Sequence, residues 1–131
     1  MRTLIVEDDL ATWFFLEKVF SSYGKCRVAV DGKEALEAFK IAWKSTEPYD
    51  LVILDLILPR MDGLELLNAI RRHEAEHGCR EPEKVKVIVA TVSTSPKDIF
   101  MAAGDECDGY LVKPFDKRML IEEVRKMGLI P

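Results

Sequence analysis

Four short apolar segments of this sequence end at polar residues that could do chemistry. In chain order these residues are Glu7 with Asp8, then Asp55, Thr91 and Lys113. Carboxylates held close together raise one another's proton affinity unless a cation relieves them. Ligands that are all oxygen favour a hard cation such as Mg²⁺. If folding groups these acids, the sequence predicts a Mg²⁺ site with Lys113 as a second, fixed cation.

The charges of such a site balance around one Mg²⁺. Glu7, Asp8 and Asp55 supply three negative charges, and Lys113 with Mg²⁺ supplies three positive ones. A phosphoryl group on a carboxylate replaces its charge by about −2, so the phosphate oxygens then need donors such as Thr91 and Lys113. Phosphoryl transfer requires positioning, neutralised equatorial oxygens and an in-line nucleophile. Asp55 is the natural nucleophile of this set.

The elements that must position these residues alternate between two patterns. Short apolar runs predict buried strands at 4–6, 27–30, 51–54, 85–90 and 110–112. Apolar residues at helical spacing predict a helix after each strand, including a short one over Lys97–Ala103 and a last one that Asp116 can cap. This alternation predicts an α/β fold with a parallel sheet covered on both faces. Ligands then bind beyond the carboxyl ends of the strands, where all the polar residues above stand.

Length and composition limit the possible function classes. The 131 residues fit one domain, and an apolar content of 48% argues against disorder. No apolar run approaches the roughly 20 residues of a membrane span, and the N-terminus lacks a signal-peptide pattern, so we expect a cytoplasmic protein with no membrane partner. Scattered basic residues and a net charge of −4 argue against direct nucleic-acid binding. Cys26, Cys79 and Cys107 match no metal spacing.

Four segments in register resemble the receiver domains of two-component response regulators. They are Leu4–Asp9, Asp55–Gly63, Val87–Thr91 and Tyr110–Phe115. The resemblance covers nearly the whole chain. It implies a flavodoxin-like, doubly wound sheet of five parallel strands in the order 2-1-3-4-5. Residues 1–131 would form a single receiver domain, with no output domain in this chain.

The resemblance also implies the function and the metal ligands. A sensor histidine kinase or a histidine phosphotransfer protein would donate a phosphoryl group to Asp55. Glu7, Asp8, Asp55 and the backbone carbonyl of Ile57 would hold Mg²⁺. The domain would be a phosphoacceptor rather than an enzyme, although it would catalyse the transfer and its own slow dephosphorylation.

The remaining roles implied by the resemblance concern the phosphate and the signal. Thr91 and Lys113 match the residues that contact the phosphate, and Tyr110 matches an aromatic switch that turns inward when Thr91 moves. The bond from Lys113 to Pro114 is often cis in the family. A downstream protein, which the sequence does not identify, would bind the face formed by the fourth helix, fifth strand and fifth helix. The chain would be a monomer or a weak homodimer that uses the same face. Met101, Tyr110, Lys117 and Met119 fall there.

Two further expectations concern individual side chains. Val92 follows Thr91 where the family usually has Ala or Gly, so we expect it to narrow access and to slow phosphorylation by small donors such as acetyl phosphate. A solvated helix face is expected to contain Arg71, Arg72, His73 and His77.

Three other functions fit parts of the pattern. A phosphatase of the haloacid dehalogenase type would need an Asp-x-Asp pair after its first strand, but Leu56 and Ile57 follow Asp55. A pseudo-receiver would lack site residues that are present here. A flavodoxin-like electron carrier would need a phosphate-binding loop where Glu7, Asp8 and Asp9 stand, and these acids would repel the phosphate of FMN.

Overall fold

The computed structural model describes residues 1–79, 83–92 and 106–131. Its elements in chain order are β1 (Thr3–Val6), α1 (Leu10–Phe20), β2 (Cys26–Ala29), α2 (Gly32–Lys44), β3 (Leu51–Asp55), α3 (Gly63–Glu76), β4 (Lys86–Thr91), β5 (Gly109–Val112) and α5 (Lys117–Lys126). The helix expected over 97–103 and the contact residue Met101 lie outside the described residues.

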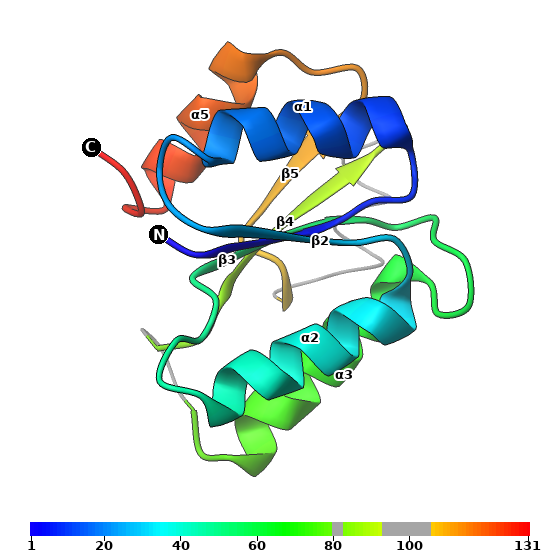
Figure 1. The fold of residues 1–131 in the computed structure, drawn as a ribbon, viewed down its shortest axis with the longest axis vertical. Coiled ribbons are helices and arrows are strands. Elements are labelled where there is room, and N and C mark those ends of the chain that lie inside the picture. The colour runs from blue at the N-terminus through cyan, green and yellow to red at the C-terminus, as the bar shows by residue number, and fades with distance from the viewer. Residues whose placement is uncertain (80–82, 93–105) are drawn as a thin grey trace.

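The five strands form one parallel sheet in the order β2-β1-β3-β4-β5, which confirms the predicted topology. Helices α1 and α5 cover one face of the sheet, and α2 and α3 cover the other (Figure 1). The register aligns the carboxyl ends of the strands: Val6 lies opposite Leu54, and Asp55 lies opposite Ala90. The residues that follow these ends are therefore neighbours at one edge.

The three central strands β1, β3 and β4 are buried on both faces because alternate side chains enter two separate cores. Leu4, Val52 and Leu54 pack toward α2 and α3, whereas Ile5 and Ile53 pack toward α1 and α5. Each of these residues is at most 1% exposed. This double burial explains why the strands read as continuous apolar runs rather than as alternating ones.

Aspartates fix the starts of the described helices close to the strand ends. Asp9, Asp31, Asp62 and Asp116 each accept a hydrogen bond from a backbone N–H three residues later, in α1, α2, α3 and α5 respectively. Gly63 shows how tightly α3 packs on β3, because a Cβ there would lie 2.2 Å from the carbonyl oxygen of Asp55. The loops that carry the candidate site are thus held at both ends.

Candidate functional site

The carboxyl ends of β1 and β3 bring three acids together. One carboxylate oxygen from each of Glu7, Asp8 and Asp55 lies within 4.8 Å of the others. Glu7 is 2% exposed and Asp55 is 9% exposed, whereas Asp8 faces solvent. The site therefore has a buried floor of two carboxylates and an open acidic rim.

Lys113, which follows β5, bridges the two buried carboxylates. Its Nζ donates to Glu7 Oε2 at 2.7 Å and to Asp55 Oδ2 at 2.8 Å. Both distances are typical of hydrogen bonds between charged groups. One ammonium thus serves two acids, and the group keeps a net negative charge that a divalent cation would offset.

Backbone amides orient the other oxygens of the two buried acids. Ile57 N donates to Asp55 Oδ1 at 3.0 Å, and Asp9 N donates to Glu7 Oε1 at 3.2 Å. The third acid of the Glu7-Asp8-Asp9 run has a separate role, since Asp9 Oδ2 caps α1 through Thr12 N at 2.9 Å. The hydrogen bonds from Thr12 lower the pKa of Asp9.

Glu7 and Lys113 each shift the pKa of the other. Burial raises the pKa of Glu7, the hydrogen bond from Lys113 offsets part of that rise, and the nearby charge of Asp55 adds to it. Burial alone would lower the pKa of Lys113, but its hydrogen bonds to Asp55 and Glu7 outweigh this and raise it. Lys113 therefore stays charged at neutral pH.

Thr91 and Tyr110 lie on the strands next to this group. Thr91 ends β4, is buried, and its carbonyl accepts from Lys113 N at 2.7 Å. Tyr110 is in β5, where it pairs with Val89 of β4. Its side chain is half-buried against the core that α2 and α3 cover. The peptide bond from Lys113 to Pro114 is cis, as expected.

Val92 stands exposed beside the group, with 63% of its surface accessible. It lines a cavity of 390 Å³ that also reaches Lys113, together with Ala11, Thr12, Phe15, Pro114 and Phe115. The cavity is mainly apolar and opens next to the acids.

The expectation of a solvated helix face at Arg71 and His73 is wrong. The Arg71 side chain is 10% exposed and donates to Glu74 Oε1 at 2.7 Å and to Asp108 Oδ2 at 3.1 Å. His73 is 8% exposed and packs edge-on against Trp43. Arg72 and His77 are exposed, as expected. In the sequence, the position of Glu74 three residues after Arg71 indicates an ion pair on one face of a helix. This spacing does not show that the pair is buried.

Comparison with known proteins decides the family. Residues 3–125 match the family described as response regulator receiver domain. The chain belongs to this family. Receiver domains are signalling domains of two-component systems, and no described helix of this one is long and apolar enough to cross a membrane.

Curated relatives include kinases and response regulators. The receiver domain is 35% identical over 127 residues to sensor histidine kinase GacS of Pseudomonas protegens, matching 95% of this chain and 13% of that protein. It is 34% identical over 128 residues to response regulator ArlR of Staphylococcus saprophyticus, matching 96% of this chain and 51% of that protein. The chain thus spans about an eighth of the kinase and about half of the regulator.

Solved structures show the same fold. The receiver domain of the Francisella response regulator 1452 superposes with a TM-score of 0.77 at 28% identity, covering 96% of this chain and 94% of that one. The receiver domain of a Pseudomonas aeruginosa sensor histidine kinase gives a TM-score of 0.74 at 24% identity, with 97% of each chain covered. That second structure has a magnesium ion coordinated in its active-site cleft.

Proposed function

We propose that this receiver domain accepts a phosphoryl group on Asp55 in a Mg²⁺-dependent reaction and signals through a changed surface. The observation that carries the proposal is the bridge from Lys113 Nζ to Asp55 Oδ2 and Glu7 Oε2, at 2.8 Å and 2.7 Å, beside the carboxylate of Asp8. Phosphoryl transfer requires a positioned nucleophile, here Asp55, and cations that neutralise the phosphoryl oxygens. Lys113 is one such cation, and Glu7 and Asp8 would help to hold a metal ion as the other.

The donor set fits Mg²⁺. All side-chain donors are carboxylate oxygens, and burial of Glu7 leaves a charge that a divalent cation would stabilise. Glu7, Asp8, Asp55 and the carbonyl of Ile57 are the proposed ligands, directly or through water. When bound, Mg²⁺ would neutralise charge on the transferring phosphoryl oxygens.

The chain's own residues position the reaction. A carboxylate oxygen of Asp55 attacks phosphorus, and the bond from phosphorus to the donor's histidine nitrogen breaks, its electron pair returning to the imidazole. Lys113 donates a hydrogen bond to one phosphate oxygen, and the hydroxyl of Thr91 donates to a second one. Attack of water on the same phosphorus regenerates the Asp55 carboxylate, which is the proposed autodephosphorylation.

Apolar residues around the acids support a protein as the donor. Leu10, Ile57 and Val92, each within three residues of a site residue along the chain, are between 63% and 69% exposed, far more than apolar side chains of a core. Exposed apolar surface beside a functional group is typical of protein docking. A sensor histidine kinase or a histidine phosphotransfer protein is therefore the proposed partner, as its relatives' membership of two-component systems also supports.

The proposed output is a rearrangement of Thr91 and Tyr110. Thr91 ends β4 directly behind the site, and Tyr110 lies one strand away on β5. Movement of the Thr91 hydroxyl toward the phosphate would let Tyr110 turn inward and change the surface near Lys117 and Met119. A downstream protein, or a second copy in a weak homodimer, would read that surface. Residues 1–131 are proposed to act as one receiver unit in the cytoplasm.

Beryllofluoride, which mimics a phosphoryl group on a carboxylate, tests the proposal. With Mg²⁺ present, we expect shifts in the NMR resonances of Thr91 and Tyr110, and none in Asp55→Asn. Without Mg²⁺ the wild-type spectrum should not change. Absence of any Mg²⁺-dependent response in the wild type would contradict the proposal.

A further inference from the structure

The exposed side of α2 carries unpaired positive charge. Lys33, Lys40 and Lys44 are all exposed and line a groove of 410 Å³ together with Leu36, Glu37, Ile41 and Met61. In the ranges 1–79, 83–92 and 106–131, no carboxylate lies within 4.0 Å of these three ammonium groups. Other cations in the same ranges do pair with acids: Arg2, Arg27, Arg60, Arg71, Lys86, Lys113, Arg118 and Lys126.

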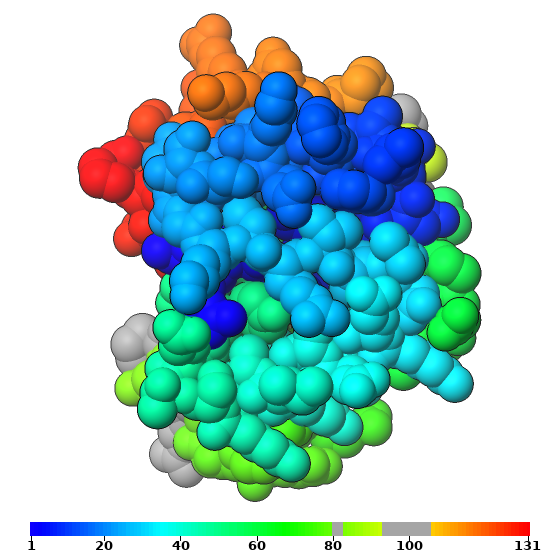
Figure 2. Space-filling model, viewed as in Figure 1, coloured from blue at the N-terminus to red at the C-terminus, as the bar shows by residue number. Residues whose placement is uncertain are grey.

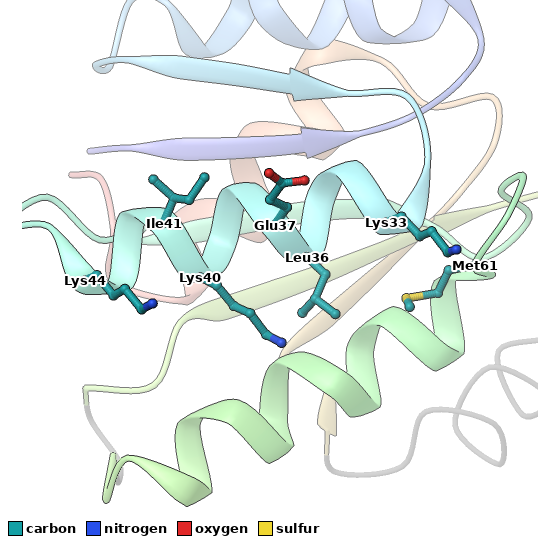
Figure 3. Close-up of a pocket in the computed structure, with 7 residues that line it drawn as sticks. All are labelled: Lys33, Leu36, Glu37, Lys40, Ile41, Lys44 and Met61. Atoms are coloured by element: carbon teal, nitrogen blue, oxygen red, sulfur yellow. The ribbon is translucent and has the colours of Figure 1, made fainter.

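The groove has a basic rim and an apolar floor. Leu36 and Lys40 point toward α3, and Lys33 lies next to Met61 (Figure 3). Glu37 and Ile41 of the same helix also line the groove. Glu37 forms no ion pair with these lysines in the described ranges, but it offsets one of their three positive charges, so the groove lining keeps a net positive charge. Leu36 and Met61 are half-buried and leave part of their apolar surface open between the ammonium groups.

Helix stability explains only part of this arrangement, because the helix dipole favours Lys44 in the last turn of α2 but not the other two features below. Lys33 is in the first turn of α2, where the positive end of the helix dipole disfavours a cation. Lys40 and Lys44 are four residues apart on one face, where like charges repel. Both features become favourable once an anionic group occupies the groove.

One end of the groove is packed tightly against the loop after β3, and the surface over α2 is open to solvent. A Cβ on Gly32 would lie 2.3 Å from the carbonyl oxygen of Met61, so the start of α2 is packed directly on the loop after β3. Arg60 Nη1 also lies 3.5 Å from Asp31 Oδ2 across this contact. The molecular surface over α2 is open to solvent in Figure 2 (cyan). Because α2 covers the β2 side of the sheet, the groove is remote from the edge formed by β5.

We propose that this α2 groove binds an acidic, amphipathic segment of a partner protein. Its carboxylates would pair with Lys33, Lys40 and Lys44, and an apolar side chain would cover Leu36 and Met61. Charge complementarity favours a short acidic peptide over a nucleic acid, since three lysines offer little counterion release and the chain as a whole carries a charge of −4.

Fluorescence anisotropy with a defined probe tests this docking. The probe is a short labelled peptide rich in glutamate, with leucines at helical spacing. We expect saturable binding that weakens as salt is raised, and weaker binding when the leucines are replaced by serine. The double variant Lys40→Glu/Lys44→Glu should weaken binding by about tenfold, because two attractions become repulsions.

The matched control reverses two charges elsewhere, in Lys18→Glu/Lys117→Glu, and should bind within about twofold of the wild type. Equal weakening in both double variants would overturn the proposal, since total charge alone would then explain binding. Absence of binding at low salt would overturn it too, as would tighter binding of a single-stranded DNA of equal charge. Thermal unfolding of each variant verifies that the fold is retained.

Discussion

Lys113 Nζ lies 2.8 Å from Asp55 Oδ2, although the two residues are 58 positions apart in the sequence. The parallel sheet produces this contact by aligning the ends of β3 and β5 at one edge. The same ammonium is 2.7 Å from Glu7 Oε2, so a single side chain neutralises charge on two buried acids.

Removal of that ammonium should destabilise the protein when no divalent cation is present. In Lys113→Ala, Glu7 and Asp55 would face each other without a counter-charge. We expect a free energy of unfolding lower by about 2 kcal/mol, measured by urea denaturation in EDTA. Mg²⁺ should restore part of the loss. Lys117→Ala, at an exposed position, is the control, and equal stability of the two variants would argue against the bridge.

The side chain of Val92 should limit access of small phosphodonors. Val92 is 63% exposed and lines the cavity that reaches Lys113. Val92→Ala should accelerate both labelling by acetyl phosphate and loss of the label by about threefold to tenfold, corresponding to roughly 1 kcal/mol in each barrier. Val30→Ala removes the same atoms from an exposed position elsewhere. Unchanged rates in Val92→Ala would show that this side chain does not obstruct the site.

The ion pairs around Arg71 should contribute strongly to stability. Glu74 is fully buried, and Arg71 also donates to the carbonyl of Val85 at 2.8 Å and to Asp108. Arg71→Met would leave the Glu74 charge buried and unpaired, which should cost about 3–5 kcal/mol in the free energy of unfolding. Arg72→Met, next in sequence but exposed, should change it by less than about 0.5 kcal/mol. Similar losses in the two variants would refute the distinction.

Acid should destabilise the fold partly through His73. Burial lowers the pKa of His73 below its ordinary value of 6.5, and the positive charges of His77 and Lys40 add to the effect. The unfolded chain therefore binds a proton at a higher pH than the folded one, so stability is lost as pH falls below 6.5.

Urea denaturation between about pH 7 and pH 5 measures that loss. His73→Gln should flatten the dependence of the unfolding free energy on pH, whereas His77→Gln should keep most of it. Trp43, whose ring centroid is 5.5 Å from that of His73, provides a fluorescence signal for the same titration. A slope unaffected by His73→Gln would contradict the assigned cause.

Local patterns were sufficient to predict the sheet and its polar edge. Short apolar runs mark strands buried on both faces, and a parallel sheet then places Glu7, Asp55 and Lys113 at one edge. The bridge by Lys113 was not predicted in detail, because it depends on side-chain conformations across three strands. The roles of Thr91 and Tyr110 came from family resemblance and remain predictions.

Long-range polar contacts were beyond sequence reasoning. In the sequence, Arg71 looks like one of several charges on an amphipathic helix. Its burial depends on contacts with Val85 and Asp108, which lie just before β4 and β5. His73 is similar, since its burial depends on Trp43 and Phe39 of the neighbouring helix α2. Helix periodicity gives the face of a residue but not the depth to which a neighbouring element covers it.

Intact-mass spectrometry of the protein treated with acetyl phosphate and Mg²⁺ tests the central claim most directly. We predict one phosphoryl group per chain, lost in Asp55→Asn and absent when EDTA replaces Mg²⁺. Retention of the label in Asp55→Asn, or equal labelling without Mg²⁺, would contradict the assignment of Asp55 as a phosphoacceptor in a metal-dependent site.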